Sequence, residues 1–338
     1  MPLAAFLTAP GTLDLKERDA LQPAPHEVVI SVEHAGVCGT DLALFSGDYS
    51  VPLPLVCGHE FVGTVSRVGD GVETSWRGRR VTAEINNTCV AYGRPTLCPA
   101  CARGMPHHCQ QRTVTGIISH NGAFAEEVLV PAGALHAIPE SVDPLTATLT
   151  EPLAAALQTF EMTPVQGDET LVVFGPGRLG ILIVFVAALK GLNVITASRS
   201  QAKRERALLF GASQSCTPGE AEACIREATQ GLGADIVVEA TGTPEGIHKG
   251  LSLVRPRGTL SLKTTCGQSG GDIDWTRLVV DEIRIQGSRC GPFDAALKIL
   301  VEHQEQLRPL ITSIRPLSEA QNALERANKE DKVVLRIA

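Results

Sequence analysis

The second half of the chain alternates short apolar runs with longer amphipathic ones, and this alternation constrains the fold more than any other feature of the sequence. Five runs beyond about Asp143 have the length and the Val/Ile content of buried strands: ETLVVFG, NVITAS, GADIVVEATG, RGTLSLKT and EIRIQGSR. Other runs predict helices: LTATLTEPLAAALQTF, RLGILIVFVAALKG, QAKRERALLFGA and PEGIHKGLSLV. Strands that alternate with helices form a parallel sheet with crossover helices, so we predict a doubly wound α/β domain.

A glycine-rich turn joins the first of these strands to the next helix. In VVFGPGRLGIL the glycines follow the pattern G-x-G-x-x-G, which permits a tight turn and brings a helix N-terminus close to a pyrophosphate. The alternative is a glycine-rich turn without a ligand. The residues that we expect to contact a dinucleotide are Gly175, Gly177, Arg178, Leu179, Gly180, Ser198, Arg199, Lys203 and Thr241.

The end of the second predicted strand indicates which dinucleotide binds. NAD sites usually carry an acidic residue there, which accepts a hydrogen bond from the ribose 2′-OH. Here the position is Ser198, and Arg199 follows it. A guanidinium beside a hydroxyl suits a 2′-phosphate, so we predict NADP in preference to NAD. The alternative is that Arg199 only begins the exposed face of the next helix.

The first 140 residues show a different pattern, in which Val- and Ile-rich runs are interrupted by glycine. The runs are HEVVISVEHAGVCG, EFVGTVSRVGDGV and RRVTAEI, and they predict a separate barrel-like or sandwich-like β domain. A length of 338 residues also favours two domains over one core. The tail ends on KVVLRI, a strand-like run that can return to the first domain.

Charge and hydropathy exclude some classes of partner. The net charge of -7 argues against nucleic acid, because phosphate binding requires a basic face. The N-terminus lacks a basic region followed by a long apolar segment, so we expect no signal peptide. The most apolar run, residues 179–189, is too short to cross a bilayer. We expect a cytoplasmic protein with neither nucleic acid nor membrane as its partner.

A histidine and a glutamate lie side by side in the apolar run VCGHEFVG, residues 56–63. Neighbouring side chains of a regular strand point to opposite faces, so either His59 or Glu60 would face the core. Burial of either group is costly unless a partner compensates, and a metal ion is such a partner. The alternative is a turn that leaves both groups in solvent.

Six of the ten cysteines lie between Cys38 and Cys109, and clustered cysteines without an export signal indicate metal ligands before disulfides. The stretches GVCGTDLALFSGD, VCGHEFVGTVSRVGDGV and GPGRLG together resemble the zinc-containing medium-chain alcohol dehydrogenases, of the polyol- and threonine-dehydrogenase type. The resemblance spans nearly the whole chain. It implies a GroES-like catalytic domain over residues 1–145, a Rossmann domain over 146–290, and a C-terminal segment over 291–338 that returns to the catalytic domain.

The resemblance also implies roles for individual residues. Cys38, His59 and Glu60 match the ligands of a catalytic zinc, and Thr40 matches the proton-relay hydroxyl. Glycines 58 and 63 are expected to let the chain bend so that both neighbours reach the metal. Glu151 matches a glutamate that faces the zinc; the alternative is an acid that stabilises the N-terminus of a helix.

Four further cysteines resemble the structural-zinc lobe of the same family: Cys89, Cys98, Cys101 and Cys109. The last three keep the usual spacing of the family. Pro95, however, occupies a position where the family's first pair of cysteines usually lies. Cys89 is therefore expected to be the first ligand, followed by an insertion before Cys98. Four thiolates would close a loop that has little core of its own. The alternative is a lost site with free thiols.

One departure from the family affects proton transfer. Ala43 occupies the place of a histidine that many members carry, so a proton path must run from Thr40 through a ribose hydroxyl or water. Asp41 is expected to cap or pair locally. The remaining histidines of this half are expected to be structural or exposed: His34, His107, His108 and His120.

The resemblance implies an enzyme that transfers a hydride between NADP(H) and an alcohol or carbonyl substrate, with one catalytic and one structural zinc, in a homodimer or homotetramer. Glu151 favours a polyol, a sugar or another secondary alcohol. The alternative is a catalytically idle NADPH- or zinc-binding protein. The presence of every expected ligand argues against that alternative and against a zinc-free quinone or enoyl reductase.

Overall fold

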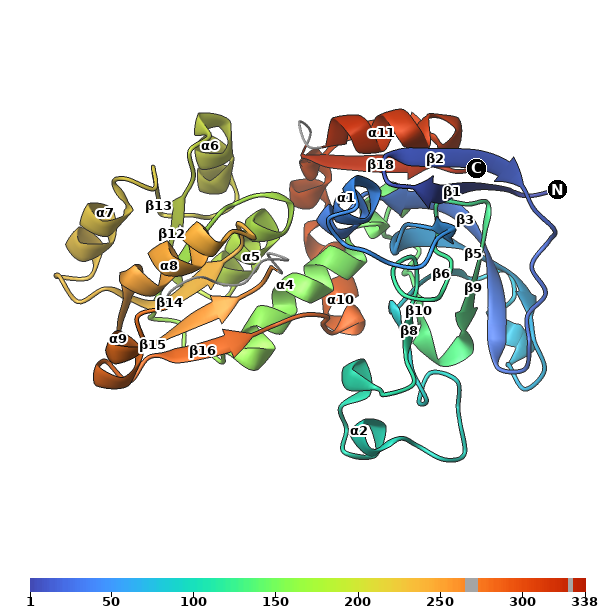
Figure 1. Ribbon diagram of the computed structural model, residues 1–338, viewed down its shortest axis with the longest axis horizontal. Helices are drawn as coiled ribbons and strands as arrows, with labels where there is room; N and C mark the ends of the chain where they lie inside the picture. Colours follow the sequence, from blue (N-terminus) through green and yellow to red (C-terminus); the bar gives the residue numbers. More distant parts are fainter. Residues whose placement is uncertain (265–272, 328–330) are drawn as a thin grey trace. The chain divides into compact units, whose positions relative to one another are not determined.

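The computed structural model describes residues 1–264, 273–327 and 331–338, which form two compact units (Figure 1). Unit 1 comprises Met1–Glu151 and Phe293–Ala338, and unit 2 comprises Pro152–Pro292. Both ends of the chain therefore belong to unit 1, whereas unit 2 is one continuous stretch. No helix among the described residues combines the length and the apolar character needed to span a membrane.

Unit 2 is built on a six-stranded parallel sheet with the order β13-β12-β11-β14-β15-β16. This is the 3-2-1-4-5-6 order of doubly wound dinucleotide-binding folds, as predicted. The strands are β11 (Thr170–Phe174), β12 (Asn193–Ala197), β13 (Gln214–Cys216), β14 (Ala234–Glu239), β15 (Val254–Leu262) and β16 (Arg284–Gly287). The helices are α4 (Thr150–Met162), α5 (Arg178–Leu189), α6 (Gln201–Leu209), α7 (Ala221–Ala228), α8 (Pro244–Leu253) and α9 (Trp275–Val280).

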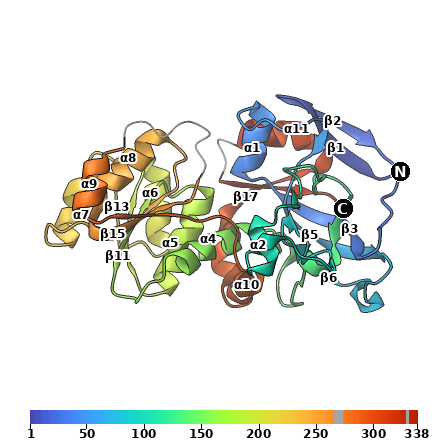
Figure 2. The same ribbon diagram turned by 60° about the horizontal axis from the view of Figure 1, so that its bottom comes forward.

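Helices lie against both faces of this sheet, which explains the apolar character of its central strands (Figures 1 and 2). All five residues of β11 are buried, with no alternation between faces. The helix that follows, α5, is buried over most of its circumference, so its sequence is apolar almost throughout. The carboxyl ends of β11 and β14 lie at the point where the strand order reverses, which is where ligands of such folds bind.

Unit 1 is built around β3, which pairs with β5 along one edge and with β9 and then β18 along the other. The main sheet has the order β10-β6-β5-β3-β18-β17. Its strands are β3 (Glu27–Gly36), β5 (Glu60–Val68), β6 (Arg80–Ala83), β9 (Glu127–Pro131), β10 (Leu135–Ala137), β17 (Ile311–Pro316) and β18 (Lys332–Arg336). Smaller sheets contain β1 (Leu3–Ala9), β2 (Thr12–Glu17), β4 (Leu55–Val56), β7 (Asn86–Asn87) and β8 (Thr113–Val114).

Short helices complete unit 1, and its last strand comes from the end of the chain. The helices are α1 (Gly39–Ser46), α2 (Pro99–Ala102), α3 (Pro144–Ala147), α10 (Phe293–Leu307) and α11 (Ala320–Ala327). The run KVVLRI forms β18, which lies between β3 and β17. Figure 1 shows α2 in a segment that projects away from the sheets of unit 1.

The run LTATLTEPLAAALQTF, predicted as one helix, is divided into α3 and α4. The reason is local hydrogen bonding by threonine. The hydroxyl of Thr148 donates to Leu145 O and that of Thr150 donates to Ala147 O, both at 2.7 Å. Such bonds compete with the helical pattern of the backbone.

Candidate functional site

Three side chains that the sequence named as zinc ligands come together in unit 1. Cys38 precedes α1, His59 lies in the turn after β4, and Glu60 is the first residue of β5. One ligand atom of each lies within 4.8 Å of the other two. His59 and Glu60 are buried and Cys38 is partly exposed. A thiolate, an imidazole and a carboxylate with one exposed side are a donor set that fits a catalytic zinc with an open position.

The turn before β5 explains how the adjacent residues His59 and Glu60 are both buried. Gly58 has φ +91°, and a Cβ there would overlap the ring of Phe124. Only glycine adopts this conformation in this space. Gly63 has a different environment. It lies inside β5 opposite Val32, where a Cβ would overlap the backbone of β3.

Asp41 links the two segments that carry the ligands. Its carboxylate accepts from the backbone N–H of Cys38 at 2.8 Å and from that of Gly58 at 3.0 Å. It also lies 3.5 Å from Nδ1 of His59. A carboxylate at one nitrogen orients the ring and leaves the other nitrogen for a metal. Asp41 therefore pairs locally and positions both ligand segments.

The electrostatics of His59 also fit a bound cation. Burial lowers the pKa of this imidazole, but the nearby Asp41 carboxylate and Cys38 thiolate raise it, so that the pKa lies well above its ordinary value. Two anionic groups thus favour a positive charge at a site from which solvent is nearly excluded. A metal cation can supply that charge in place of a proton.

Lys332 is a residue of the site that the sequence did not reveal. It begins β18, is buried, and pairs with the carboxylate of Glu60. Its Nζ also donates to Val37 O at 3.3 Å. A Cβ at Gly36 would lie 2.5 Å from Glu60 Oε2, so this glycine makes room for the pair. The only signal in the sequence was a lysine directly before the apolar run Val333–Leu335 of this strand.

Thr40 and Glu151 differ in their relation to the three ligands. The Thr40 hydroxyl lies 3.9 Å from Cys38 Sγ, in the first turn of α1, and is therefore beside the ligand set. Glu151 lies in the first turn of α4, and its carboxylate is not among the three groups that lie within 4.8 Å of one another. An acid in the first turn also suits the helix dipole, so both roles considered for Glu151 remain compatible with its position.

A second group of ligands consists of cysteines alone. The Sγ atoms of the four lobe cysteines lie within 4.8 Å of one another, and all four side chains are buried. Cys89 Sγ lies 3.4 Å from Cys109 Sγ, so Cys89 fills the place left by Pro95. Four buried sulfurs at this spacing fit a closed tetrahedral zinc site.

Backbone N–H groups stabilise charge on these sulfurs. Cys109 Sγ accepts from the N–H groups of Cys89 and Gln111, both at 3.4 Å. The N–H groups of Cys101 and Gln110 lower the pKa of Cys98 to about 6. Burial and the neighbouring thiols raise the pKa of Cys101 to about 12. Without a cation, these sulfurs therefore do not all ionise near neutral pH, and a metal would remove that restriction.

The glycine-rich turn of unit 2 has the shape that a dinucleotide requires. Gly175 has φ +96°, and a Cβ on Gly180 would overlap Gly175 O. A Cβ on Gly177, in contrast, would meet no atom within 4 Å. The first and third glycines are thus needed by the fold, and the second leaves open space before the N-terminus of α5, where Arg178 and Leu179 begin the helix.

The residues after β12 are those that the sequence predicts to contact the ribose 2′ substituent. Ser198 is held by its N–H, which donates to Cys216 O at 3.0 Å. Arg199 and Lys203 are exposed, the latter in the first turn of α6. Arg204, which the sequence did not single out, donates to Ser198 O at 2.8 Å and to Arg199 O at 3.1 Å. It fixes the backbone on which the other side chains stand.

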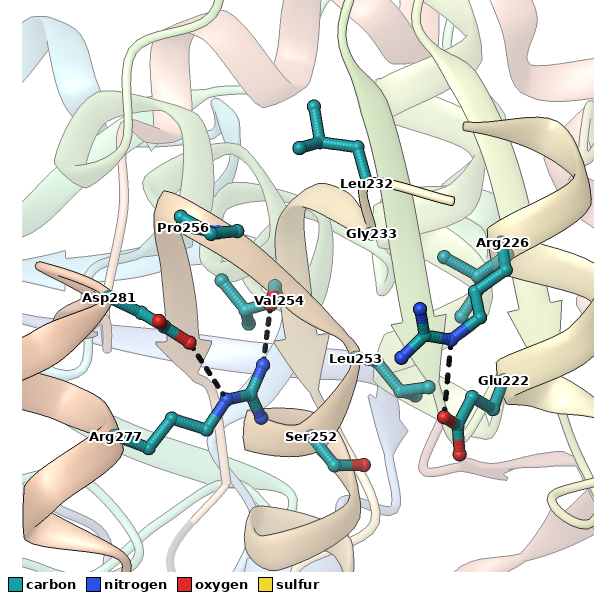
Figure 3. A pocket seen from close by; sticks show the side chains of 11 residues that line it. Glu222, Arg226, Leu232, Gly233, Ser252, Leu253, Val254, Pro256, Arg277 and Asp281 are labelled. Carbon is teal, nitrogen blue, oxygen red and sulfur yellow. Dashed lines mark hydrogen bonds and ion pairs between the residues drawn. The ribbon is translucent and has the colours of Figure 1, made fainter. Parts of the chain in front are cut away.

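A cavity of about 390 Å³ lies elsewhere in unit 2 (Figure 3). An ion pair lies on each side of it: Arg226 with Glu222 at 3.2 Å and Arg277 with Asp281 at 3.1 Å. Val254, at the amino end of β15, also lines it. The predicted dinucleotide site lies at the carboxyl ends of the same parallel strands, so this cavity is not that site.

Models of known protein families match both halves of the chain. Residues 24–140 match the model of the "Alcohol dehydrogenase GroES-like domain", and residues 179–303 match that of "Zinc-binding dehydrogenase". A sorbitol dehydrogenase of Halalkalibacterium halodurans is 30% identical over 316 residues, which cover 91% of this chain and 90% of that protein. An L-threonine 3-dehydrogenase of Pyrococcus horikoshii is 35% identical over 268 residues, which cover 77% and 75%.

Solved structures show the same fold over the full length. A zinc-binding dehydrogenase of Sinorhizobium meliloti bound to NADP has a TM-score of 0.90 and 29% identity, with 100% of this chain and 99% of that chain covered. An alcohol dehydrogenase of Escherichia coli complexed with NADH has a TM-score of 0.90 and 26% identity, with 99% of each chain covered.

Proposed function

Because this chain belongs to the zinc-containing alcohol dehydrogenase family, we propose that it is a zinc- and NADP-dependent oxidoreductase that interconverts a secondary alcohol and its carbonyl compound. The observation that carries the proposal is the meeting of Cys38, His59 and Glu60 beside Thr40 in unit 1. Such a set, together with a glycine-rich turn of the dinucleotide type, supplies the two components of this chemistry.

We assign separate roles to the residues of the site. Cys38, His59 and Glu60 hold the metal, while Asp41 and Lys332 orient and neutralise them. The Thr40 hydroxyl accepts the proton of the substrate hydroxyl and passes it to a ribose hydroxyl or water, because Ala43 offers no imidazole. Zinc bound here supplies Lewis-acid polarisation of the substrate oxygen. A dinucleotide bound to unit 2 would supply the hydride acceptor for oxidation of the alcohol.

We infer a preference for NADP from the side chains after β12. The Ser198 hydroxyl oxygen accepts from Ser200 N at 3.3 Å, which leaves its hydrogen for a phosphate oxygen. Arg199 and Lys203 supply positive charge on exposed side chains. Each charge-assisted bond to the phosphate contributes ~1.5–3 kcal/mol, and solvent exposure reduces this value.

Steady-state kinetics with both cofactors test the preference. We expect kcat/KM to be roughly tenfold to a hundredfold higher with NADP than with NAD. The double substitution Ser198→Asp with Arg199→Leu should move the ratio toward NAD, whereas Lys203→Gln should weaken NADP alone. A wild-type kcat/KM that is higher with NAD contradicts the proposal and leaves Arg199 as a solvated charge.

The substrate class that we propose is a polyol, a sugar or a related secondary alcohol. The support is the glutamate at position 151 and the names of the relatives, among which are a sorbitol dehydrogenase and L-threonine 3-dehydrogenases. A screen of polyols, sugars, hydroxy amino acids and simple alcohols with each cofactor tests the class. Turnover restricted to simple primary alcohols contradicts it.

We propose two zinc ions per chain, because two separate groups of ligand atoms have the geometry of a zinc site. Metal analysis of protein purified without chelators tests the count. Protein that holds both metals, binds NADPH and oxidises none of these alcohols would support the idle binding protein instead.

The quaternary state that we propose is a homodimer formed through the edge of the unit 2 sheet. Among the described residues, β16 pairs only with β15, so its other edge is open. Large apolar side chains are exposed on α9, which precedes β16 in the chain, and on β16 itself: Trp275 by 68%, Val279 by 78%, Val280 by 73% and Ile285 by 40%. An open strand edge flanked by apolar side chains suits a second copy related by twofold symmetry.

Sedimentation tests this interface. The wild-type chain should sediment as a dimer or a multiple of it, and Val280→Glu with Ile285→Lys should yield monomers. Lys298→Glu, a change of an exposed residue that belongs to unit 1, is the control. A wild-type monomer contradicts the proposal.

A further inference from the structure

Glu239 is a fully buried carboxylate to which the proposed reaction gives no role. It is the last residue of β14, with 0% of its surface exposed. It lies opposite Phe174, the last residue of β11, at the point where the strand order of the sheet reverses. Dinucleotides bind across the crevice at this point, so the carboxylate lies beneath the predicted cofactor site.

The carboxylate is held by four donors from two loops. Oε1 accepts from the N–H of Thr241 at 2.6 Å, from the N–H of Gly242 at 3.1 Å and from the Thr241 hydroxyl. Oε2 accepts from the Thr264 hydroxyl at 3.0 Å, just beyond β15. An ionised carboxylate is an acceptor at every position, whereas the amide of a glutamine would turn an NH₂ group toward some of these donors. Glu239 thus fixes the turn after β14 and ties it to the end of β15.

Thr241, which Glu239 holds, packs against the glycine-rich turn. A Cβ added to Gly175 would lie 2.8 Å from Thr241 Cγ2. The Thr241 hydroxyl also lies 3.0 Å from that of Thr243, the N-cap of α8. A Cβ on Gly246 would overlap the Thr241 hydroxyl, so the first turn of α8 is shaped around this network. Movement of the turn after β14 would therefore disturb the phosphate-binding turn directly.

We propose that Glu239 is a positioning residue of the dinucleotide site, which sets the affinity for the cofactor by fixing Thr241 against Gly175. The inference rests on the proposed function in one respect, namely that the chain binds NADP(H). It adds a buried group of unit 2, which is neither a metal ligand nor one of the residues expected at the ribose 2′ position, on which cofactor affinity depends. Since Glu239 has no surface exposed to a ligand, it acts through the residues that it holds.

The test is the dissociation constant of NADPH, measured by its fluorescence on full-length protein loaded with zinc. We expect Glu239→Gln to raise this constant at least tenfold and Thr241→Val to raise it about fivefold. Because both act through one contact, the double variant should match Glu239→Gln instead of multiplying the two effects. Zinc content should remain that of the wild type in all three variants.

Asp235→Asn provides a matched control at the other end of the same strand. The Asp235 carboxylate accepts from Thr170 N at 2.8 Å and from Arg255 Nε at 2.6 Å, so its loss also breaks bonds to β11 and to β15. It should lower the thermal midpoint and leave the dissociation constant within twofold of the wild type. A merely structural role of Glu239 would make the two variants alike.

Two outcomes overturn the inference. In the first, the dissociation constant of NADPH for Glu239→Gln lies within twofold of the wild-type value. In the second, Asp235→Asn loses as much affinity for NADPH as Glu239→Gln does. Wild-type protein that binds neither NADPH nor NADH contradicts the proposed function, and the inference with it. If Glu239→Gln does not fold, the Thr241→Val variant alone tests the inference, because this variant keeps the Glu239 carboxylate. Unchanged affinity in that variant overturns the inference.

Discussion

The two groups of metal ligands are built in different ways. Cys38, His59 and Glu60 come from separate places around β3 and β5, and charged side chains, Asp41 and Lys332, surround them. The four cysteines of the lobe lie within one excursion of the chain, and backbone N–H groups are their partners. The first group is held in place by the sheets of unit 1. The second has almost no other core, since only Ala100 packs against its four cysteines among the partly buried apolar residues described.

This difference separates function from stability. A metal held by a preformed set of ligands can be lost while the fold remains, because the sheets and the ion pair with Lys332 hold the ligands. A metal held by a short loop contributes the folding energy of that loop. Four predictions test the contrast, in order of decreasing effect.

The largest expected effect is on the lobe. Cys101→Ser or Cys109→Ser should destabilise it by at least about 5 kcal/mol, since a structural zinc site supplies roughly 10–16 kcal/mol. Limited proteolysis in the segment 90–108, together with zinc analysis, measures the loss of stability and of zinc. The value of kcat, calculated per intact chain, should be reduced less than the stability of the lobe is. The buried Cys290→Ala is a control outside both groups. A stable variant, or wild-type protein with all four thiols free, contradicts the structural role.

Removal of a ligand from the first group should lower turnover and leave the fold intact. Cys38→Ser or His59→Ala should lower kcat/KM by on the order of 10³-fold or more, the size expected for an essential group of the reaction. The dissociation constant of NADPH should stay within about twofold, because the glycine-rich turn belongs to unit 2. Wild-type activity in either variant after removal of the metal contradicts the catalytic role.

Lys332→Met tests how the first group is supported. In zinc-free protein, removal of one partner of the buried pair leaves the Glu60 carboxylate uncompensated, so we expect its free energy of unfolding to fall by about 3 kcal/mol. Urea unfolding measures the change, and Lys332→Arg, which keeps the charge, is the matched control. An unfolding midpoint unchanged by Lys332→Met shows that Glu60 does not depend on the pair.

The smallest effect concerns the link between the lobe and the sheets. His136 Nδ1 lies 2.7 Å from Asp294 Oδ1, and its Nε2 lies 3.8 Å from Glu84, which also lies 3.8 Å from His107 of the lobe. Burial lowers the pKa of His136, but the nearby Glu84 carboxylate and the hydrogen bond to Asp294 raise it above its ordinary value. A raised pKa in the folded state stabilises the protein fully below the unfolded pKa of about 6.5, and this stabilisation is lost as the pH rises through the folded pKa.

His136→Gln should therefore lower the free energy of unfolding by ~0.5–1 kcal/mol at pH 6, and by less at pH 9. The value is that of a surface pair, because the Asp294 side chain is 81% exposed. Urea unfolding at the two pH values measures it. Equal destabilisation at both contradicts the charged link.

Much of the fold, and the two groups of side chains that come together as candidate ligands, could be predicted from the sequence. The strands and helices of unit 2 follow the period of their apolar residues, and β11, β12 and β14 lie where the runs predicted them. The fold class and the family resemblance are confirmed by the strand order and the matching family models. These features depend on residues that are near in sequence, which is where pattern analysis is effective.

The partners that support the sites could not be predicted. Lys332 and Glu60 are 272 residues apart, and only the pairing of β18 with β3 brings them together. Glu239 has the appearance of an ordinary residue at the end of a strand until the turn after it is seen to wrap around its carboxylate. Such contacts depend on topology and on the path of a turn, neither of which leaves a periodic signal.

The origin of β18 at the end of the chain has a consequence for synthesis on the ribosome. Unit 2 is continuous and can form its sheet while the tail is still being made, since domains generally fold as units during translation. Unit 1 cannot be completed then, because one edge of β3 and the counter-charge of Glu60 are supplied by β18, which follows unit 2 in the chain. The proposed site of the catalytic metal is therefore completed only after unit 2 has been synthesised, and a chain truncated before β18 lacks both an edge partner of β3 and the counter-charge of Glu60.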